Sequence, residues 1–235
     1  MQALLVGNSD GIGLTTSRKL LARGWQVAGI SRSASPIEDA AYVHVVSEVQ
    51  VPGYRETLQA LLDRLDPLDL CIYCAGVGEL LDPSDMDREV EIVDVNLLGM
   101  LRTAARVIPP MVARGRGHFI GISSLADAMR SPQAPSYHAS KAGLSCYLES
   151  LALALAPRGV HVTNVRFGFV DTKMAKGDFK PFMLDVDRAA EHLLACIDER
   201  PIRHTAPRIA IPLVRLRSCL LELEVLRGAE SRKPK

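Results

Sequence analysis

Short apolar segments alternate with longer amphipathic stretches along most of the chain. A short, continuously apolar run predicts a buried strand, and apolar residues that recur every three or four positions predict a helix with one buried face. The expected strands are Ala3–Gly7, Gln26–Ile30, Tyr42–Val46, Leu68–Cys74, His118–Ile122, Val160–Val165 and a short final strand at Arg208–Ile211. The expected helices are Gly11–Arg23, Tyr54–Leu65, Tyr137–Ala156, Asp187–Glu199 and Leu213–Arg227, together with two helices inside Met86–Arg114.

The alternation of strands and helices indicates the fold class. Strands that are apolar on both faces must be covered on both sides, which is typical of parallel sheets. The pattern therefore predicts an α/β fold of the Rossmann type, a doubly wound parallel sheet with helices on both faces. The chain of 235 residues has no repeat and no linker, so we expect a single domain over residues 1–235.

Composition and charge narrow the classes of function. Hydrophobic residues make up 48% and charged residues 23%, as in ordinary soluble proteins with a packed core. The 28 basic and 27 acidic residues give a net charge of +1, so we expect no nucleic-acid partner. No apolar run is long enough to span a membrane and no basic segment precedes the first strand, so we expect a cytoplasmic protein.

The five cysteines fit the same compartment. Cys71 and Cys74 form a Cys-x-x-Cys pair, but they lie in a predicted strand, where their side chains should point to opposite faces. We therefore expect neither a metal site nor a redox pair, and we interpret the cysteines as reduced thiols of a cytoplasmic protein.

A glycine-rich loop follows the first strand and precedes the first helix. Glycines at Gly7, Gly11 and Gly13 would let the backbone turn sharply and approach a pyrophosphate, which the helix N-terminus would then attract. The alternative is a plain tight turn, although the position between strand and helix favours a dinucleotide. The expected cofactor contacts of this loop are Gly7, Ser9, Asp10, Gly11, Ile12 and Gly13.

The end of the second strand predicts which dinucleotide binds. An acid at this position would bind the ribose 2′-hydroxyl of NAD, but no carboxylate occurs before Glu38. Arg32 can instead pair with a 2′-phosphate, and Ser31 can add a hydroxyl. We therefore expect NADP (NADPH) to be preferred over NAD, with a solvated surface charge as the alternative interpretation of Arg32.

Four polar residues are candidates for the chemistry. Tyr137 and Lys141 are four residues apart on a predicted helix and so share one face. Ser124 follows the fifth strand, at the edge where open α/β sheets bind ligands, and Asn96 lies early in a helical stretch. Ser123 is the rival of Ser124, because adjacent residues cannot both face the same ligand.

Taken in order, these motifs resemble the short-chain dehydrogenase/reductase family from Ala3 to about Thr172. The spacing of thirteen residues from Ser124 to Tyr137 matches the family pattern. The motifs are Gly7-x-x-x-Gly11-Ile12-Gly13, then Ala75-Gly76, Asn96, Ser124, Tyr137-x-x-x-Lys141, and Gly168 with Thr172.

The resemblance implies a nicotinamide-dependent oxidoreductase that interconverts a carbonyl and an alcohol. Tyr137 would transfer the proton, and Lys141 would lower the pKa of Tyr137 and hold the nicotinamide ribose. Ser124 would bind the substrate oxygen, and Asn96 would hold a water that connects Lys141 to solvent. The further cofactor contacts that the resemblance implies are Glu48, Val49, Cys74, Ala75, Gly76, Tyr137, Lys141, Gly168, Val170 and Thr172.

Some positions depart from the family pattern without removing a member of the tetrad. Val6 replaces a threonine before the glycine loop, and Glu48 replaces an aspartate expected near the adenine. Cys74 replaces an asparagine, which puts a hydrogen bond between central strands in doubt. Phe167 replaces a proline, a change that could reshape the nicotinamide end of the pocket.

The C-terminal third carries the expectations about substrate. Residues 172–200 stand where the family places its substrate loop and the following helix. The helix at 213–227 would pack on the core or on a subunit, with a lid over the substrate or a peripheral membrane contact as alternatives. Residues 228–235 are expected to form a flexible tail. An apolar pocket, and hence a hydrophobic ketone or 3-oxoacyl-type substrate, is suggested by Phe179, Pro181, Phe182, Met183 and Leu184.

The motifs also bear on the oligomeric state and on a competing, non-catalytic function. The resemblance implies a homodimer or homotetramer that pairs through Val95–Arg114 and Tyr137–Ala156. A protein that binds NADP and regulates without turnover is the competing function, and the presence of all four tetrad residues favours the enzyme. The direction of the reaction, its stereochemistry and the identity of the substrate are not specified by these residues.

Overall fold

The computed structural model describes residues 1–174 and 180–230, and for residues 215 and 224–230 it describes the backbone only. Phe179 and residues 231–235 of the expected tail lie outside the described residues. Within the described part, seven strands form one parallel sheet in the order β3-β2-β1-β4-β5-β6-β7. The strands are β1 (Gln2–Val6), β2 (Gln26–Ser31), β3 (Tyr42–Val46), β4 (Leu70–Tyr73), β5 (Gly117–Ser124), β6 (Val160–Phe167) and β7 (Arg203–Ala206). The α-helices are α1 (Gly11–Ala22), α2 (Tyr54–Leu62), α3 (Asp87–Val93), α4 (Gly99–Arg114), α5 (Pro135–Leu155), α6 (Val186–Glu199) and α7 (Ile211–Glu230).

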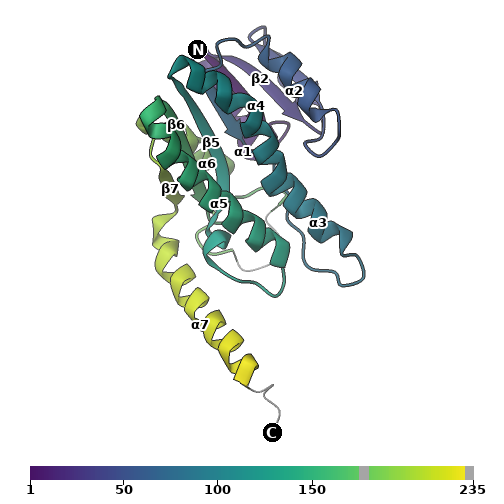
Figure 1. Cartoon of the computed structure of the whole chain (residues 1–235), viewed down its shortest axis with the longest axis vertical. Coiled ribbons are helices and arrows are strands. Elements are labelled where there is room, and N and C mark those ends of the chain that lie inside the picture. Colours follow the sequence, from purple (N-terminus) through teal and green to yellow (C-terminus); the bar gives the residue numbers. More distant parts are fainter. Residues whose placement is uncertain (175–179, 231–235) are drawn as a thin grey trace.

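The sheet is covered on both faces, as the apolar strands predict. Leu4 and Val6 of β1 belong to an apolar cluster shared with α2, α4 and α5, whereas Ala3 and Leu5 pack with α1 and α6 (Figure 1). Successive strand residues thus alternate between two cores, and for this reason the residues on both faces of the strand must be apolar. This arrangement confirms the doubly wound α/β fold.

The chain reverses its direction across the sheet between β1 and β4. From β1 the connections lead outward through β2 to β3, and from β4 they lead the opposite way through β5 to β7. The connections that follow β1 and β4 therefore lead to opposite edges of the sheet, which in open α/β sheets produces a crevice at the carboxyl ends of the two strands. Open α/β sheets bind their ligands at such a reversal point.

The expected final strand at Arg208–Ile211 is wrong. Residues Arg208–Ala210 form a short 3-10 helix that leads into α7, and Ile209 is 67% exposed. The seventh strand is the preceding β7, whose backbone pairs with β6 in parallel register. This strand is mostly polar because it lies at the edge of the sheet, so an apolar pattern could not identify it.

The long helical pattern over Met86–Arg114 forms two helices, as expected, but a π-helical turn, η1 (Asp94–Leu98), joins them. The Tyr73 hydroxyl donates a hydrogen bond of 2.6 Å to the carbonyl oxygen of Val95 inside this turn. A π turn inserts a residue into the helix and rotates the side chains that follow it, and such turns are frequent at functional sites. Asn96 lies within this one.

Helix α7 extends away from the sheet (Figure 1). It is tied to the rest of the chain by an ion pair of 2.8 Å between Arg130 and Glu222. The core of this chain does not cover the leucines of its apolar stripe, which are 47–60% exposed at Leu213, Leu216, Leu220 and Leu223. Among the helices described, none combines the length and apolar character needed to cross a bilayer.

The two cysteines of the Cys-x-x-Cys pair point to opposite sides of the sheet. Cys71 lies in the cluster under α2, α4 and α5, and Cys74 packs against the cluster under α1 and α6. The prediction from the strand period is confirmed, and both thiols are free.

Candidate active site

The loop between β1 and α1 requires glycine at two positions. Gly7 has φ +84°, and a Cβ atom there would lie 2.5 Å from the backbone nitrogen of Ala75. A Cβ at Gly13 would lie 2.3 Å from the carbonyl oxygen of Gly7. The first glycine therefore lets the loop touch the end of β4, and the second lets α1 start directly behind the loop.

Two polar residues of this loop hold it in place. The Asp10 carboxylate caps α1 by accepting a hydrogen bond of 2.8 Å from the backbone of Gly11. The hydrogen bond from Lys173, supported by the one from Gly11, lowers the pKa of Asp10. Asn8, which the sequence motifs did not single out, is fully buried and donates to Ser17 and to the Tyr42 hydroxyl. The N-terminus of α1 is thereby fixed at the crevice.

The candidate NADP residues at the end of β2 differ in their availability. Ser31 is buried, and its hydroxyl donates to the carbonyl oxygen of Ser33 at 3.0 Å and lies 3.2 Å from Nε2 of His44. Arg32 is exposed, and within the described part of the chain no carboxylate pairs with it. Arg32 is therefore free to meet an anion, while the hydroxyl of Ser31 already has partners.

The expected cofactor contacts after β3 and β4 differ in their burial and their hydrogen bonds. Glu48 is exposed, whereas Val49 is buried in the core below α4. The backbone nitrogen of Cys74 donates to the carbonyl oxygen of Val6 at 2.8 Å, so the strand pair β1–β4 is closed without the asparagine that is usual in the family. Gly76 passes next to the catalytic candidates, since a Cβ there would lie 3.3 Å from Oδ1 of Asn96.

The structure separates the two serines at the end of β5. The Ser123 hydroxyl is buried and lies 2.7 Å from the Ser145 hydroxyl of α5. The Ser124 hydroxyl accepts a hydrogen bond of 3.1 Å from the backbone of Ala126, and it lies near enough to the Tyr137 hydroxyl to act on the pKa of that group. Ser124, and not Ser123, therefore faces the tyrosine.

Tyr137 and Lys141 lie on successive turns near the start of α5. The Lys141 ammonium is 5.8 Å from the centre of the Tyr137 ring and donates a hydrogen bond of 3.0 Å to the carbonyl oxygen of Ile122. Gly76 and Gly78 pass directly over this pair: a Cβ at Gly78 would lie 3.1 Å from the tyrosine ring. Three segments that are distant in the sequence thus meet at one place.

Burial sets the protonation of both side chains. It lowers the pKa of Lys141 from 10.5 to about 8, and the nearby Asp127 carboxylate opposes this shift. It raises the pKa of Tyr137 above its usual 10, and the hydrogen bond to Ser124 works against that increase. Desolvation is therefore the largest influence on the pKa of Tyr137. The Lys141 ammonium is hydrogen-bonded to the carbonyl oxygen of Ile122, and its effect on the tyrosine stays a prediction.

Asn96 connects the loop after β4 with α5. Its amide donates to the carbonyl oxygen of Val77 at 2.9 Å and to the Ser140 hydroxyl at 3.0 Å, and its Oδ1 accepts from the Val77 nitrogen at 2.8 Å. All the polar atoms of this buried side chain are therefore used to hold the protein together. The loop over Tyr137 and Lys141 depends on it.

The segment after β6 reaches across the crevice to the glycine loop. The methyl group of Thr172 would be 3.4 Å from a Cβ at Gly11, and the Gly168 nitrogen is anchored to the carbonyl oxygen of Ala206. Val170 is buried. Phe167 is also buried and packs 6.4 Å from the ring of His192, so it belongs to the core and does not line the crevice.

Several apolar side chains of the segment after β6 are exposed. Phe169, Met174, Phe182 and Met183 are 38–48% exposed, and Leu184 is half-buried against the core. The terminal methyl group of Met174 would lie 3.6 Å from a Cβ at Gly76, which places it at the catalytic candidates. Of the residues expected to form the apolar pocket, Phe179 is outside the described part.

Sequence reasoning missed a buried ion pair behind the site. Arg166 of β6 donates two hydrogen bonds, of 2.5 and 2.6 Å, to the Asp127 carboxylate, and the Ser145 hydroxyl donates a third of 2.5 Å. Asp127 follows Ser124 by only three residues, so the ion pair supports the segment that carries this serine. The position of this acidic residue close to a candidate catalytic serine was the only sequence signal that could have indicated the ion pair.

These contacts suit a nicotinamide dinucleotide. The glycines at Gly7 and Gly13 leave space that a side chain would fill, next to the free N–H groups of a helix N-terminus. The buried ammonium of Lys141 has three N–H donors, of which one is used by the carbonyl oxygen of Ile122, and another could bind a hydroxyl. The donor set therefore fits a pyrophosphate at one end and a ribose at the other.

Comparisons with known proteins agree with this geometry. A family model described as short chain dehydrogenase matches residues 1–181. An uncharacterized oxidoreductase of Myxococcus xanthus is 34% identical over 203 residues, which is 80% of each chain. A 3-oxoacyl-(acyl-carrier-protein) reductase of Vibrio cholerae is 28% identical over 183 residues, which cover 74% of this chain and 75% of that protein.

A solved structure resembles the whole fold. It is a short-chain dehydrogenase of Burkholderia cenocepacia J2315 in complex with NADP, 25% identical, with a TM-score of 0.80 over 93% of this chain and 95% of that one. The parallel sheet, the glycine loop at its reversal point and the family match over residues 1–181 lead to one conclusion. This chain belongs to the short-chain dehydrogenase/reductase family, and it is an oxidoreductase that acts on CH–OH and C=O groups with a nicotinamide cofactor.

Proposed function

We propose that the protein reduces a hydrophobic carbonyl compound to an alcohol, or catalyses the reverse reaction, with NADP and with Tyr137 as the proton-transfer residue. The observation that carries this proposal is the meeting of three groups. The Ser124 hydroxyl lies near the Tyr137 hydroxyl and acts to lower its pKa, and Lys141 lies one turn further along α5, at the crevice of the sheet.

The protein residues supply a proton and stabilise charge. The bound nicotinamide supplies or accepts the hydride. Tyr137 donates its hydroxyl proton to the substrate oxygen, and its raised pKa keeps that proton in place at neutral pH. Ser124 donates a hydrogen bond to the same oxygen as negative charge develops on it. Lys141, with a pKa of about 8, is charged at neutral pH and favours the tyrosinate that is left.

We assign Asn96 a positioning role. Its three hydrogen bonds fix the loop of Gly76 and Val77 above Lys141. The family resemblance also implies that Asn96 holds a water. The side chain is already fully hydrogen-bonded, so the backbone carbonyl oxygen of Asn96 would hold that water.

Preference for NADP over NAD follows from the end of β2. Arg32 is exposed with no acidic partner in the described residues, and an acid that would bind a 2′-hydroxyl does not occur before Glu38. Arg32→Ala should therefore raise the KM for NADPH by roughly 10-fold, since one charge-assisted contact contributes about 1.4 kcal/mol, and leave the KM for NADH almost unchanged. Similar changes for both nucleotides would refute the assignment.

The apolar entrance favours a hydrophobic substrate. The exposed Phe169, Met174, Phe182 and Met183 would contact an alkyl or acyl chain. We therefore expect kcat/KM to increase along a series of ketones with longer alkyl chains, and a flat series would contradict the assignment. A 3-oxoacyl-type compound belongs in the same panel, because the Vibrio cholerae relative carries that name.

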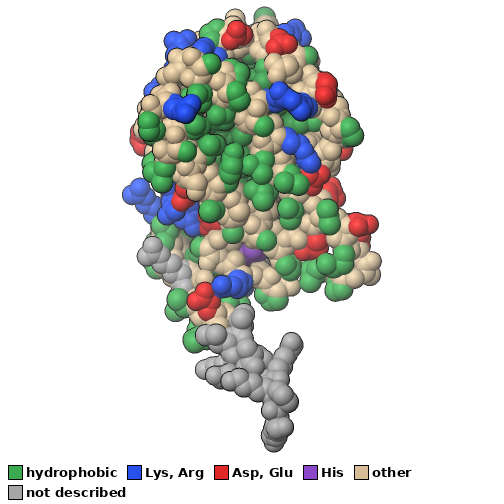
Figure 2. Space-filling view, in the orientation of Figure 1, with side chains coloured by type: hydrophobic (Ala, Val, Ile, Leu, Met, Phe, Trp, Pro, Cys, Tyr) green, Lys and Arg blue, Asp and Glu red, His purple; other side chains and the backbone are tan. Residues whose placement is uncertain are grey.

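We also propose a homo-oligomer that forms through α4 and α5, in the cytoplasm. Apolar side chains gather on the face of the molecule over these helices (Figure 2). Tyr147 and Leu153 of α5, and Leu98 directly before α4, are 36–68% exposed. Sedimentation analysis of the wild type and of Leu153→Glu tests the interface.

The central experiment compares the wild type with Tyr137→Phe. The loss of NADPH absorbance is followed with the carbonyl panel, and NADPH binding is measured separately by fluorescence. We expect Tyr137→Phe to bind NADPH normally and to lose at least about 100-fold in kcat, the usual size of a general-acid contribution. NADPH binding without turnover of any substrate by the wild type would favour a regulatory protein. Equal turnover by the wild type and Tyr137→Phe would refute the role of the tyrosine.

A further inference from the structure

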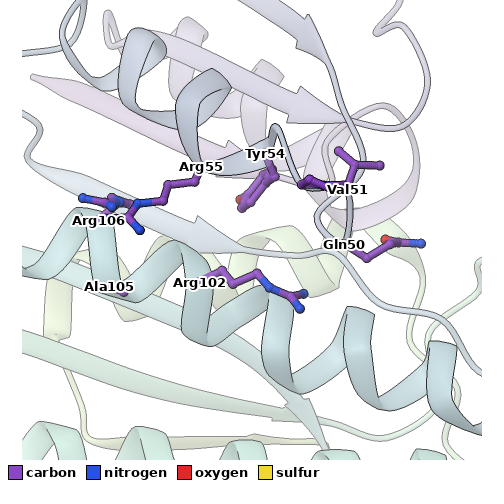
Figure 3. A pocket seen from close by; sticks show the side chains of 8 residues that line it. Gln50, Val51, Tyr54, Arg55, Arg102, Ala105 and Arg106 are labelled. Carbon is purple, nitrogen blue, oxygen red and sulfur yellow. The ribbon is translucent and has the colours of Figure 1, made fainter.

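A second cavity lies outside the crevice, between α2 and α4. It has a volume of about 490 Å³ and is lined by side chains of these helices and of the loop before α2 (Figure 3). We call it the arginine pocket, and its lining residues are Gln50, Val51, Pro52, Tyr54, Arg55, Arg102, Ala105 and Arg106. Neither the proton transfer nor the expected dinucleotide contacts use any of them.

The charge of this pocket is unbalanced. Three of its lining residues are arginines and none is an acid. Arg102 is held in place by an ion pair of 2.8 Å with Asp94 and by a hydrogen bond of 3.5 Å to the carbonyl oxygen of Val49. For Arg55 and Arg106 the described part of the chain offers no ion pair. Two guanidinium groups thus lack a counter-charge.

These two side chains come from different helices and converge. Figure 3 shows Arg55 of α2 reaching toward Arg106 of α4. Like charges repel, so their approach costs free energy unless an anion lies between them. The planar guanidinium groups present paired N–H donors whose spacing suits the oxygens of a phosphate.

The start of α2 lies beside the arginines. This helix begins at Tyr54 after Gly53, and no side chain caps its N-terminus. The positive end of the helix dipole favours negative charge, but the Tyr54 nitrogen already donates to the carbonyl oxygen of Val51 and Glu56 places a carboxylate in the first turn. The case for a bound anion therefore rests on the arginines. Arg55 itself lies in this first turn, so the helix end and the guanidinium groups border the same cavity.

From these observations we infer that the arginine pocket is a binding site for a small anion with two or more phosphate groups, separate from the dinucleotide site. The dinucleotide phosphates are expected at the loop of Gly7–Gly13 and at Arg32, which follow β1 and β2. The arginine pocket instead lies on the helical layer formed by α2 and α4. Its residue Gln50 directly follows the expected cofactor contact Val49, so the titrations with and without NADPH test whether both sites can be occupied together.

The test uses tripolyphosphate as the probe, titrated calorimetrically into the full-length protein at low ionic strength. NADPH at a saturating concentration blocks the dinucleotide site, and a parallel titration without NADPH counts the sites. The test variant is Arg55→Gln with Arg106→Gln. The control variant, Arg64→Gln with Arg158→Gln, removes the same charge at two exposed arginines outside the pocket.

We expect wild type and control to bind one tripolyphosphate in the presence of NADPH. The test variant should bind it roughly 100-fold more weakly, as expected for the loss of two charge-assisted contacts. If both variants lose the same affinity for tripolyphosphate, the effect comes from the net charge of the protein, and the proposed site is refuted. A test variant that binds normally, or that changes only the oligomeric state, would also overturn it. The basal carbonyl reduction should remain unchanged in both variants, so failure of this inference is separable from failure of the proposed reaction.

Discussion

The buried ion pair between Asp127 and Arg166 gives the sharpest test of the structure. The Asp127 side chain is 6% exposed and that of Arg166 is 13% exposed, and two hydrogen bonds of 2.5 and 2.6 Å join them. Asp127→Asn keeps the shape but removes the charge, and it leaves the Arg166 guanidinium buried without a counter-ion. Breaking a buried pair in this way costs about 3 kcal/mol or more of the free energy of unfolding.

The measurement is equilibrium unfolding in urea at neutral pH. Asp187→Asn is the control, because its ion pair with Lys19 is 3.2 Å long and its carboxylate side chain is 75% exposed. Exposed pairs contribute about 0–1 kcal/mol, so the control should unfold close to the wild type. The double variant Asp127→Asn with Arg166→Met should recover part of the loss, since it removes both buried charges. If Asp127→Asn and the control differ by less than about 1 kcal/mol, the argument from burial is refuted.

Three further predictions concern the site itself. The pKa of Lys141 is about 8 in the folded protein and 10.5 in the unfolded chain, so between these pH values only the unfolded state holds the proton. The free energy of unfolding should therefore rise with pH across this window, by about 3 kcal/mol relative to Lys141→Met. Urea unfolding at several pH values checks the sign, and a free energy of unfolding that falls with pH would contradict it. Gly13→Ala puts a methyl group 2.3 Å from the carbonyl oxygen of Gly7 and should abolish NADPH binding measured by fluorescence quenching, so normal binding would exclude the close approach. Ser124→Ala should lower kcat by roughly 100-fold, a typical loss for one oxyanion-binding donor. Ser123→Ala should keep its kcat and lose only about 1 kcal/mol in the free energy of unfolding. Steady-state kinetics with the best ketone compare the two variants, and a larger loss of kcat in Ser123→Ala would contradict the assignment.

The sequence was informative wherever a property is local. The spacing of Tyr137 and Lys141 places them on one helix face because a helix has 3.6 residues per turn. The opposite orientation of Cys71 and Cys74 follows from the two-residue period of a strand. The core strands were recognised because a parallel sheet buries both faces.

Predictions failed where a partner far away in the chain decides the outcome. The strand β7 is polar, and only its pairing with β6 makes it a strand. The π-helical turn at Asn96 cannot be distinguished by periodicity from the helices on either side. The leucine stripe of α7 has the helical period, but the period does not say that the chain's own core leaves it exposed.

The sequence by itself determined the fold class, the family and the candidate catalytic residues, because these depend on local periodicity and on motifs at fixed spacings. Only the tertiary structure decided that burial raises the pKa of Tyr137, that Asp127 and Arg166 pair behind Ser124, and that arginines of α2 and α4 line one cavity. Burial and charge are set by the groups that surround a side chain in space. Those groups come from segments tens of residues apart, which the order of residues along the chain does not reveal.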